Sequence, residues 1–127
     1  MFGWGDADDA HRQVYREDGG PEHQAKLSHE LIAGGAAFEG FKKFEDHQRA
    51  EGKPVNHAFA KEVLVGFVGG EVDRLAETKG MDFADKERAK HQAKKHAEEM
   101  YDSHYGENDQ YDPSMRPPDH IDRYGNY

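Results

Sequence analysis

The nine histidines of this chain are its most obvious candidates for chemistry, because imidazole is a common metal ligand. The sequence contains no His-Glu-x-x-His motif and no pair of histidines four residues apart. The best candidate ligand set is His96, Met100 and His104, which follow one another at one-turn spacing and would suit copper better than zinc. We favour the alternative that these histidines border an apolar stripe and pair with acids such as Asp102. We therefore expect no metal ion and no other cofactor.

Catalysis by a nucleophile or by an acid–base pair finds little support in the sequence. Ser28, His29 and Glu30 are the residue types of a catalytic triad, but neighbours on a helix point about 100° apart and cannot form a relay. Glu45 is the one acid on the apolar stripe of its predicted helix, and Arg74 lies on the matching face of the next helix, yet the two are too far apart along a hairpin to pair. Cysteine is absent, which excludes thiolate nucleophiles. We predict no catalytic residue and a non-enzymatic protein.

The apolar residues gather in one part of the chain. Of the 19 Leu, Ile, Val and Phe residues, 16 lie within residues 27–83, so we expect one compact core between polar flanks. The formal net charge of -9 leaves no basic face that could neutralise phosphates. The longest uncharged core run, residues 63–70, is far shorter than the ~20 residues of a membrane span. We expect a soluble, cytoplasmic protein with no nucleic-acid partner and no membrane span.

Periodicity and capping residues predict an all-α fold, a small bundle built on an antiparallel helical hairpin with a third amphipathic helix. We expect a helical domain over residues 22–105, after an N-terminal extension, residues 1–21, in which 6–17 can form a short helix capped by Asp6. The three main helices are predicted over residues 22–50, 57–79 and 83–104. Asn56 and Asp82 are the expected N-caps of the last two, and Gly80 ends the second.

Residues 106–127 form an acidic segment with tyrosines and prolines and only one aliphatic branched residue, Ile121. Such a composition predicts no packed element, and we favour a solvated tail. The alternative is that Tyr111, Tyr124 and Tyr127 dock on the bundle or on a neighbouring molecule.

Six glycines lie inside the first two predicted helices, and each costs about 1 kcal/mol relative to alanine. If the helices fold back near Gly52, residues whose numbers add to about 105 face each other, so that Gly34 and Gly35 lie beside Gly70 and Gly40 lies beside Gly66. We expect the glycines to let the two backbones approach closely. Four aromatic side chains would then close over the contact: Phe38, Phe41, Phe59 and Phe67.

The same patch has a functional alternative, in which part of it faces outward and forms a surface for self-association. Gly69 with Ala33, Ala36 and Ala37 would form such a surface. Substitution of Gly66 or Gly70 by leucine is expected to destabilise the fold if the glycines pack against each other.

Several blocks of the sequence resemble the fungal CipC-like antibiotic response family, also called concanamycin-induced protein C. The blocks are Ser28-His29-Glu30-Leu31-Ile32-Ala33-Gly34-Gly35-Ala36-Ala37-Phe38-Glu39, Gly52-Lys53-Pro54-Val55-Asn56-His57-Ala58, Glu71-Val72-Asp73-Arg74-Leu75-Ala76-Glu77-Thr78-Lys79-Gly80 and Asp85-Lys86-Glu87-Arg88-Ala89-Lys90. The resemblance implies a small intracellular protein of filamentous fungi that is associated with stress and antibiotic response. It implies no catalytic residue.

Two classes of function remain open. The leading hypothesis is a stress-response protein that acts as a homo-oligomer or through a protein partner, because the helix over residues 57–79 is apolar nearly all round. The alternative is a small-molecule or metal-ion binding protein that uses the glycine patch or the face of His96, Met100 and His104.

Overall fold

The computed structural model describes residues 3–15, 29–118 and 121, and these residues form four α-helices. The helices are α1 (Trp4–Val14), α3 (His29–Glu51), α4 (His57–Lys79) and α5 (Phe83–Tyr105). The described residues contain no strand, only one isolated β-bridge between Val55 and Tyr111. The predicted all-α class is confirmed.

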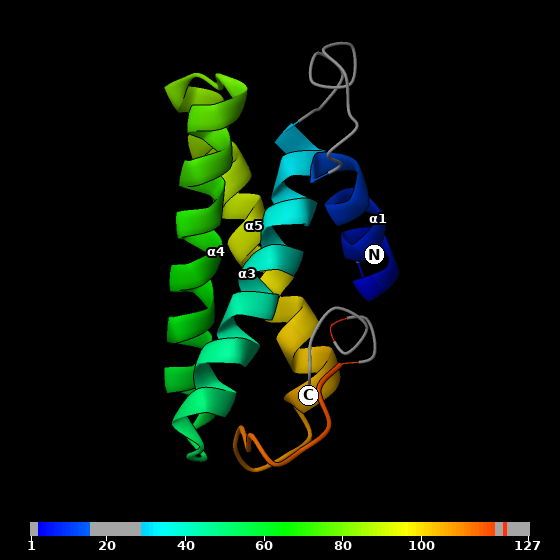
Figure 1. Cartoon of the computed structure of the whole chain (residues 1–127), viewed down its shortest axis with the longest axis vertical. Coiled ribbons are helices and arrows are strands. Elements are labelled where there is room, and N and C mark those ends of the chain that lie inside the picture. Colours follow the sequence, from blue (N-terminus) through cyan, green and yellow to red (C-terminus); the bar gives the residue numbers. More distant parts are fainter. Residues whose placement is uncertain (1–2, 16–28, 119–120, 122–127) are drawn as a thin grey trace.

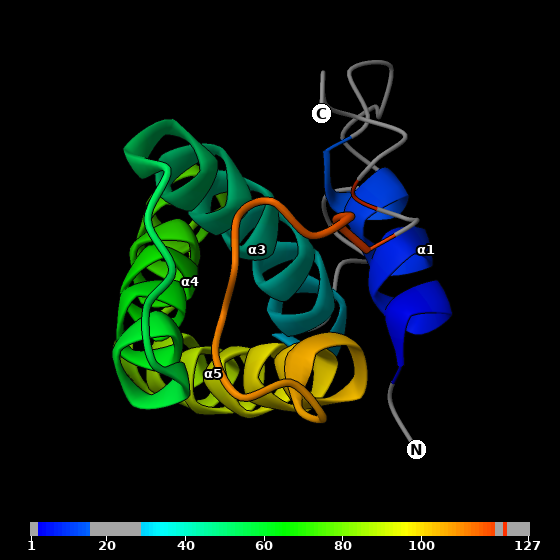
Figure 2. The ribbon, with the colours of Figure 1, turned by 90° about the horizontal axis from the view of Figure 1, so that it is seen from below.

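The three long helices form a bundle, and α1 packs on the outside of α3 (Figure 1). Seen from below, α1 and α4 lie on opposite sides of α3 (Figure 2). Helix α3 packs extensively against all three other described helices, whereas α4 packs extensively against α3 and α5. None of the described helices combines the length and the apolar character needed to cross a membrane.

Local capping signals place the helix ends. The Asn56 side chain accepts a hydrogen bond from the amide of Phe59 at 2.7 Å, and Asp82 accepts one from the amide of Asp85 at 2.8 Å. Gly80 ends α4 in the left-handed conformation, with φ of 72°. These three predictions are confirmed. They could be made from the sequence because each cap depends on only a few neighbouring residues.

The first helix begins earlier than predicted. Gly3, rather than Asp6, occupies the N-cap of α1, and the Asp6 carboxylate accepts a hydrogen bond from the Gly3 amide at 3.0 Å. Asp6 thus closes the first turn from inside the helix, as the acidic member of a capping box does. Residues 16–28 lie outside the described residues, and with them the predicted start of the second helix at residue 22.

The apolar core contains side chains from all four helices. Phe38, Phe41 and Phe44 of α3 are fully buried, and the predicted α5 stripe of Ala89, Ala93, Ala97 and Met100 is buried as well. The Trp4 ring of α1 meets Phe41 edge-on at a centroid distance of 4.7 Å. Helix α1 therefore belongs to the core.

The predicted glycine register is wrong. Gly66 and Gly70 are exposed, and a Cβ at either position would meet nothing within 4 Å. Gly40 lies instead against Val68, whose backbone would be 2.7 Å from an added Cβ, and Gly35 lies against Val14 of α1. The prediction considered only two helices and did not include the packing of α1, which takes the contact at Gly35.

Other members of the predicted patch also lie elsewhere. Gly34 is buried in α3, and Gly69 is covered by the Lys94 side chain of α5. Phe59 is 49% exposed and closes over no contact, while Phe67 is half-buried beside the His47 ring. The outward-facing alternative is wrong in its residues too, because Ala33, Ala36 and Ala37 are completely buried.

The segment after α5 is packed against the bundle. It crosses the lower end beneath α3 (Figure 2), and Tyr111, Pro117, Pro118 and Ile121 are buried. The prediction of a solvated tail is therefore wrong for residues 111–118, and the docking alternative holds at Tyr111. Tyr124 and Tyr127 lie outside the described residues.

Candidate functional site

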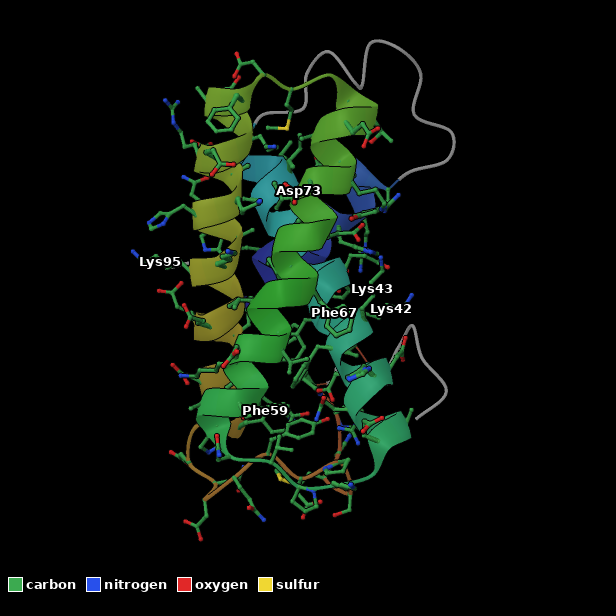
Figure 3. All side chains as sticks on the ribbon, turned by 90° about the vertical axis from the view of Figure 1, so that its left-hand side faces the viewer. Lys42, Lys43, Phe59, Phe67, Asp73 and Lys95 are labelled. Atoms are coloured by element: carbon green, nitrogen blue, oxygen red, sulfur yellow. The ribbon has the colours of Figure 1, made fainter. Side chains whose placement is uncertain are left out.

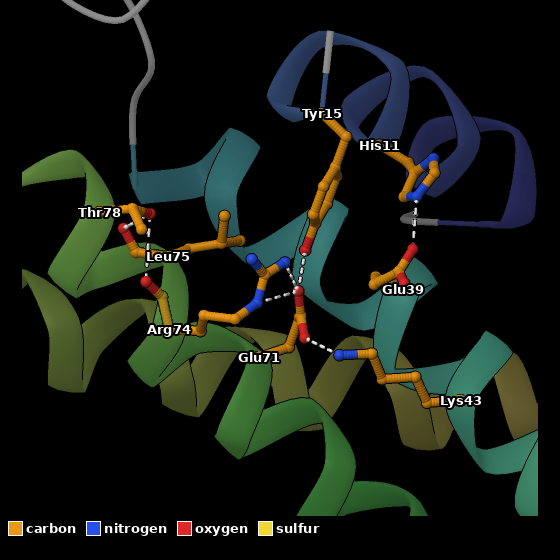
Figure 4. Close-up of polar contacts among 8 residues, drawn as sticks. All are labelled: His11, Tyr15, Glu39, Lys43, Glu71, Arg74, Leu75 and Thr78. Atoms are coloured by element: carbon orange, nitrogen blue, oxygen red, sulfur yellow. Dashed lines mark hydrogen bonds and ion pairs between the residues drawn. The ribbon is translucent and has the colours of Figure 1, made fainter. Parts of the chain in front are cut away.

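A buried carboxylate joins three helices at one end of the bundle (Figure 4). Glu71 of α4 accepts hydrogen bonds from the Tyr15 hydroxyl at 2.5 Å, from the Lys43 ammonium at 2.7 Å and from the Arg74 guanidinium. Burial raises the pKa of Glu71, but the hydrogen bonds from Arg74, Lys43 and Tyr15 outweigh it and hold the pKa below its ordinary value. Glu71 is thus an ionised link between the end of α1, α3 and α4.

A second buried carboxylate anchors the C-terminal segment at the other end. Glu45 is fully buried and accepts hydrogen bonds from the Tyr111 hydroxyl at 2.7 Å, from the Arg49 guanidinium at 3.1 Å and from the Tyr105 hydroxyl. Arg49 also donates to the carbonyl oxygens of Pro113 and Met115, at 2.5 and 2.7 Å. The Glu45–Arg49 ion pair therefore holds the segment at Tyr111 and at two nearby backbone carbonyl groups.

His57 adds a second attachment for the same segment. Its Nε2 lies 2.5 Å from the carbonyl oxygen of Asn108, and its Nδ1 lies 2.6 Å from the Tyr101 hydroxyl. Because a carbonyl oxygen can only accept, Nε2 carries a proton and donates it to Asn108. Val55 and Tyr111 exchange two backbone hydrogen bonds beside it, at 3.0 and 2.9 Å. We call the cluster of Glu45, Arg49, His57, Tyr105 and Tyr111 the C-terminal anchor.

Both clusters link separate parts of the chain. Both carboxylates are buried, and each accepts hydrogen bonds from several side chains. Glu45 and Arg74, which the sequence numbering placed too far apart to pair, belong to different clusters. Of the triad-like run, Ser28 lies outside the described residues.

The three candidate metal ligands of α5 have separate surroundings. Met100 is buried in the core, and His104 donates from Nε2 to the carbonyl oxygen of Arg116 at 2.9 Å. His96 Nδ1 lies 3.8 Å from Glu99, and burial lowers the pKa of His96. Within residues 3–15, 29–118 and 121, no group of three or more His, Cys, Asp and Glu side chains could hold a metal ion.

The outer face of α4 is not covered by another of the described helices. Figure 3 looks onto this side, with Phe59 and Phe67 along α4. At about 100° per residue, Phe59, Val63, Gly66 and Gly70 fall within an arc of about 60°, and Phe67 lies about 40° beyond it. Of these, Phe59, Gly66 and Gly70 are exposed and Val63 and Phe67 are partly buried. We call these five residues the α4 face.

The α4 face contains four of the predicted site residues, Phe59, Gly66, Phe67 and Gly70. The other five, Gly34, Gly35, Phe38, Gly40 and Phe41, are buried residues of α3. The sequence analysis did not predict the hydrogen-bonded clusters around Glu45 and Glu71. The available signals were Glu45 as the one acid on an apolar stripe, with Arg49 four residues later.

The fold defines a small helical-bundle protein, in which α1 packs on the outside of α3 and the segment after α5 packs across the lower end of the bundle. The family model described as virulence factor CipC-like matches residues 10–104, about three quarters of the chain. The chain belongs to this CipC-like family. The membership supports the stress and antibiotic response setting that the sequence resemblance implied. Comparisons with curated proteins and with solved structures found no match.

Proposed function

We propose that this chain is a non-enzymatic protein of the stress and antibiotic response that acts by associating with a second copy of itself through the α4 face. The proposal includes a cytoplasmic location in a filamentous fungus, which rests on the family resemblance. The observation that carries it is the pair of exposed glycines, Gly66 and Gly70, between the partly exposed apolar side chains of α4.

The two glycines are costly where they stand. Each lowers the stability of the helix by about 1 kcal/mol relative to alanine, and none of the described residues makes a contact there that needs the missing side chain. Bare backbone at one-turn spacing does allow another helix to approach closely. A helix from another molecule can therefore offset a cost that the isolated bundle leaves uncompensated.

The α4 face is complementary to a second copy of itself. If two α4 helices lie antiparallel about a two-fold axis near residues 66 and 67, Val63 of each copy lies over Gly70 of the other. The two Gly66 backbones then meet near the axis, with a Phe67 ring from each copy beside them. A two-fold contact of this kind uses the same patch on both molecules, as closed dimers do.

Sedimentation velocity over a concentration series tests the proposal. The wild-type chain should pass from monomer to dimer as its concentration rises. Gly66→Gln should remain monomeric, because the new side chain occupies the position of closest approach. It should also fold at least as stably as wild type when dilute, since Gln favours a helix over Gly and meets open space.

Ala58→Gln is the matched control. Ala58 is exposed on the same helix, about 100° round from Phe59, so its substitution adds a similar side chain outside the α4 face. This variant should dimerise like wild type. A wild-type chain that stays monomeric at the highest attainable concentration, or a Gly66→Gln variant that still dimerises, would overturn the proposal.

A further inference from the structure

The lower end of the bundle holds residues 106–118 through the backbone of that segment (Figure 2). Val55 and Tyr111 exchange two main-chain hydrogen bonds, at 3.0 and 2.9 Å, as neighbouring antiparallel strands do. Side chains of the bundle donate to further carbonyl oxygens of the segment. These pairs are Arg49 with Pro113 and Met115, His57 with Asn108, and His104 with Arg116. Such contacts bind a chain without depending on its side chains.

One side chain of the segment is recognised individually. Tyr111 is fully buried, and its ring packs against Phe44 and Tyr105 at centroid distances of 5.2 and 4.9 Å. Its hydroxyl donates to Glu45 at 2.7 Å. A buried tyrosine is an effective anchor because it contributes both ring area and a directed hydrogen bond. The bundle thus combines main-chain contacts with a buried place for one tyrosine, as peptide-binding domains do.

The segment forms its own turn directly after the buried tyrosine. Asp112 accepts at Oδ1 from the Ser114 amide at 2.9 Å and from the Ser114 hydroxyl at 2.7 Å. The Met115 amide donates to the Asp112 carbonyl oxygen at 3.0 Å. These hydrogen bonds are local to the segment, so they do not require the bundle. The turn brings two carbonyl oxygens together on Arg49, and a tyrosine followed by such a turn therefore carries the main features that the bundle contacts.

The receiving side chains of the C-terminal anchor are held by the bundle itself. Arg49 donates to Glu45 at 3.1 Å and to the Tyr105 hydroxyl at 3.2 Å, and His57 lies 2.6 Å from the Tyr101 hydroxyl. Without the segment, Glu45 keeps Arg49 and Tyr105 as donors, so no buried charge loses its partner. The part of the chain that matches the CipC-like family contains Arg49 and His57 and ends before the segment. The receiving site is thus oriented independently of the segment that fills it.

We propose that this end of the bundle is a recognition site for a peptide segment of a partner protein, in which a tyrosine is followed by a tight turn of the Asp-Pro-Ser type. Residues 106–118 of the chain itself occupy the site when that partner is absent. A tethered occupant acts at an effective concentration of roughly 1 mM, so a partner segment must bind more tightly than the chain's own segment to displace it. This recognition does not depend on the association through the α4 face.

Fluorescence anisotropy of a labelled peptide of residues 106–118 tests the site in the full-length chain. The wild-type chain should bind the peptide weakly, because its own segment competes. Tyr111→Ala in the chain removes the buried ring from the tethered segment, so this variant should bind the peptide at least about tenfold more tightly. Tyr111→Phe should give a smaller gain, since it removes only the hydroxyl group. Circular dichroism checks the helices of both variants, and the milder one serves if the other does not fold.

Gln110→Ala in the chain is the matched control, because Gln110 precedes the buried tyrosine and is exposed. This variant should bind the peptide as weakly as wild type does. A peptide that carries Tyr111→Phe should bind the Tyr111→Ala chain about tenfold more weakly than the unchanged peptide, since it cannot donate to Glu45.

Two results would overturn the proposal. If neither Tyr111 variant of the chain binds the peptide, the segment is an inseparable part of the fold. If the wild-type, Gln110→Ala and Tyr111→Ala chains all bind it equally, the peptide attaches outside the site. The labelled peptide reports on this site alone, so either result leaves the sedimentation test of the α4 face unaffected.

Discussion

Alanine substitutions at Gly40 and at Gly66 should change stability in opposite directions, although both residues lie inside long helices. A Cβ at Gly40 would lie 2.6 Å from a Val68 methyl and 2.7 Å from the Val68 Cα, whereas a Cβ at Gly66 meets nothing within 4 Å. Alanine gains about 1 kcal/mol of helix propensity at either site. At Gly40 the overlap is with backbone, which cannot turn aside, so overpacking costs about 2–3 kcal/mol, the upper part of its usual range.

We therefore expect Gly40→Ala to lower the free energy of unfolding by about 1–2 kcal/mol. Gly66→Ala should raise it by about 1 kcal/mol. Urea unfolding followed by circular dichroism measures both, in dilute solution so that self-association does not contribute. This outcome replaces the expectation, drawn from the sequence, that a larger residue at Gly66 overpacks the hairpin. A Gly40→Ala variant as stable as wild type would refute the observed contact between α3 and α4.

Two further predictions concern the C-terminal anchor. Tyr111→Phe removes one hydrogen bond to the buried Glu45 carboxylate, so it should lower the free energy of unfolding in urea by about 1.5–3 kcal/mol. Proteolysis of residues 106–118 should also become faster. A variant as resistant as wild type to both urea and protease would contradict the C-terminal anchor. Burial raises the pKa values of Tyr101, Tyr105 and Tyr111 above their ordinary value, so above about pH 10 the unfolded chain releases protons that the folded chain retains. Stability should then fall by about 1.4 kcal/mol per pH unit for each tyrosine, and tyrosinate absorbance should appear together with unfolding; smooth titration of a folded chain would exclude this account.

Local signals were sufficient to predict the helices. The N-caps at Asn56 and Asp82 and the left-handed Gly80 each depend on a hydrogen bond or a backbone angle within a few residues. The alanine stripe of α5 was equally readable, because one narrow apolar face leaves only one way to bury it.

The pairing of α3 with α4 was not predictable in the same way. Helix α4 carries apolar residues on most of its circumference, so periodicity did not select which face is buried. The buried face of α4 consists of Leu64, Val68, Val72 and Leu75, whereas Phe59 and Gly66 are exposed. The contact of Gly35 with Val14 depends on α1, which has only a weak periodicity of apolar residues.

The C-terminal segment shows why composition misled the prediction of a solvated tail. Few aliphatic residues normally mean little surface to bury and hence disorder. Here the attachment comes from a buried ion pair. Glu45 accepts a hydrogen bond from the Tyr111 hydroxyl, and Arg49 donates hydrogen bonds to the carbonyl oxygens of Pro113 and Met115. An acid on an apolar helical stripe was the visible sign, but its partners lie about 60 residues away in the sequence.

The two buried carboxylates also determine which surfaces remain available. Glu71 ties the end of α1 to the bundle, so that α1 covers one side of α3. Glu45 ties the C-terminal segment across the lower end, beneath α3 (Figure 2). Among the described residues, neither α1 nor this segment lies on the outer side of α4, because α1 and α4 are on opposite sides of α3 (Figure 2). A second copy can therefore reach the α4 face without displacing either of them.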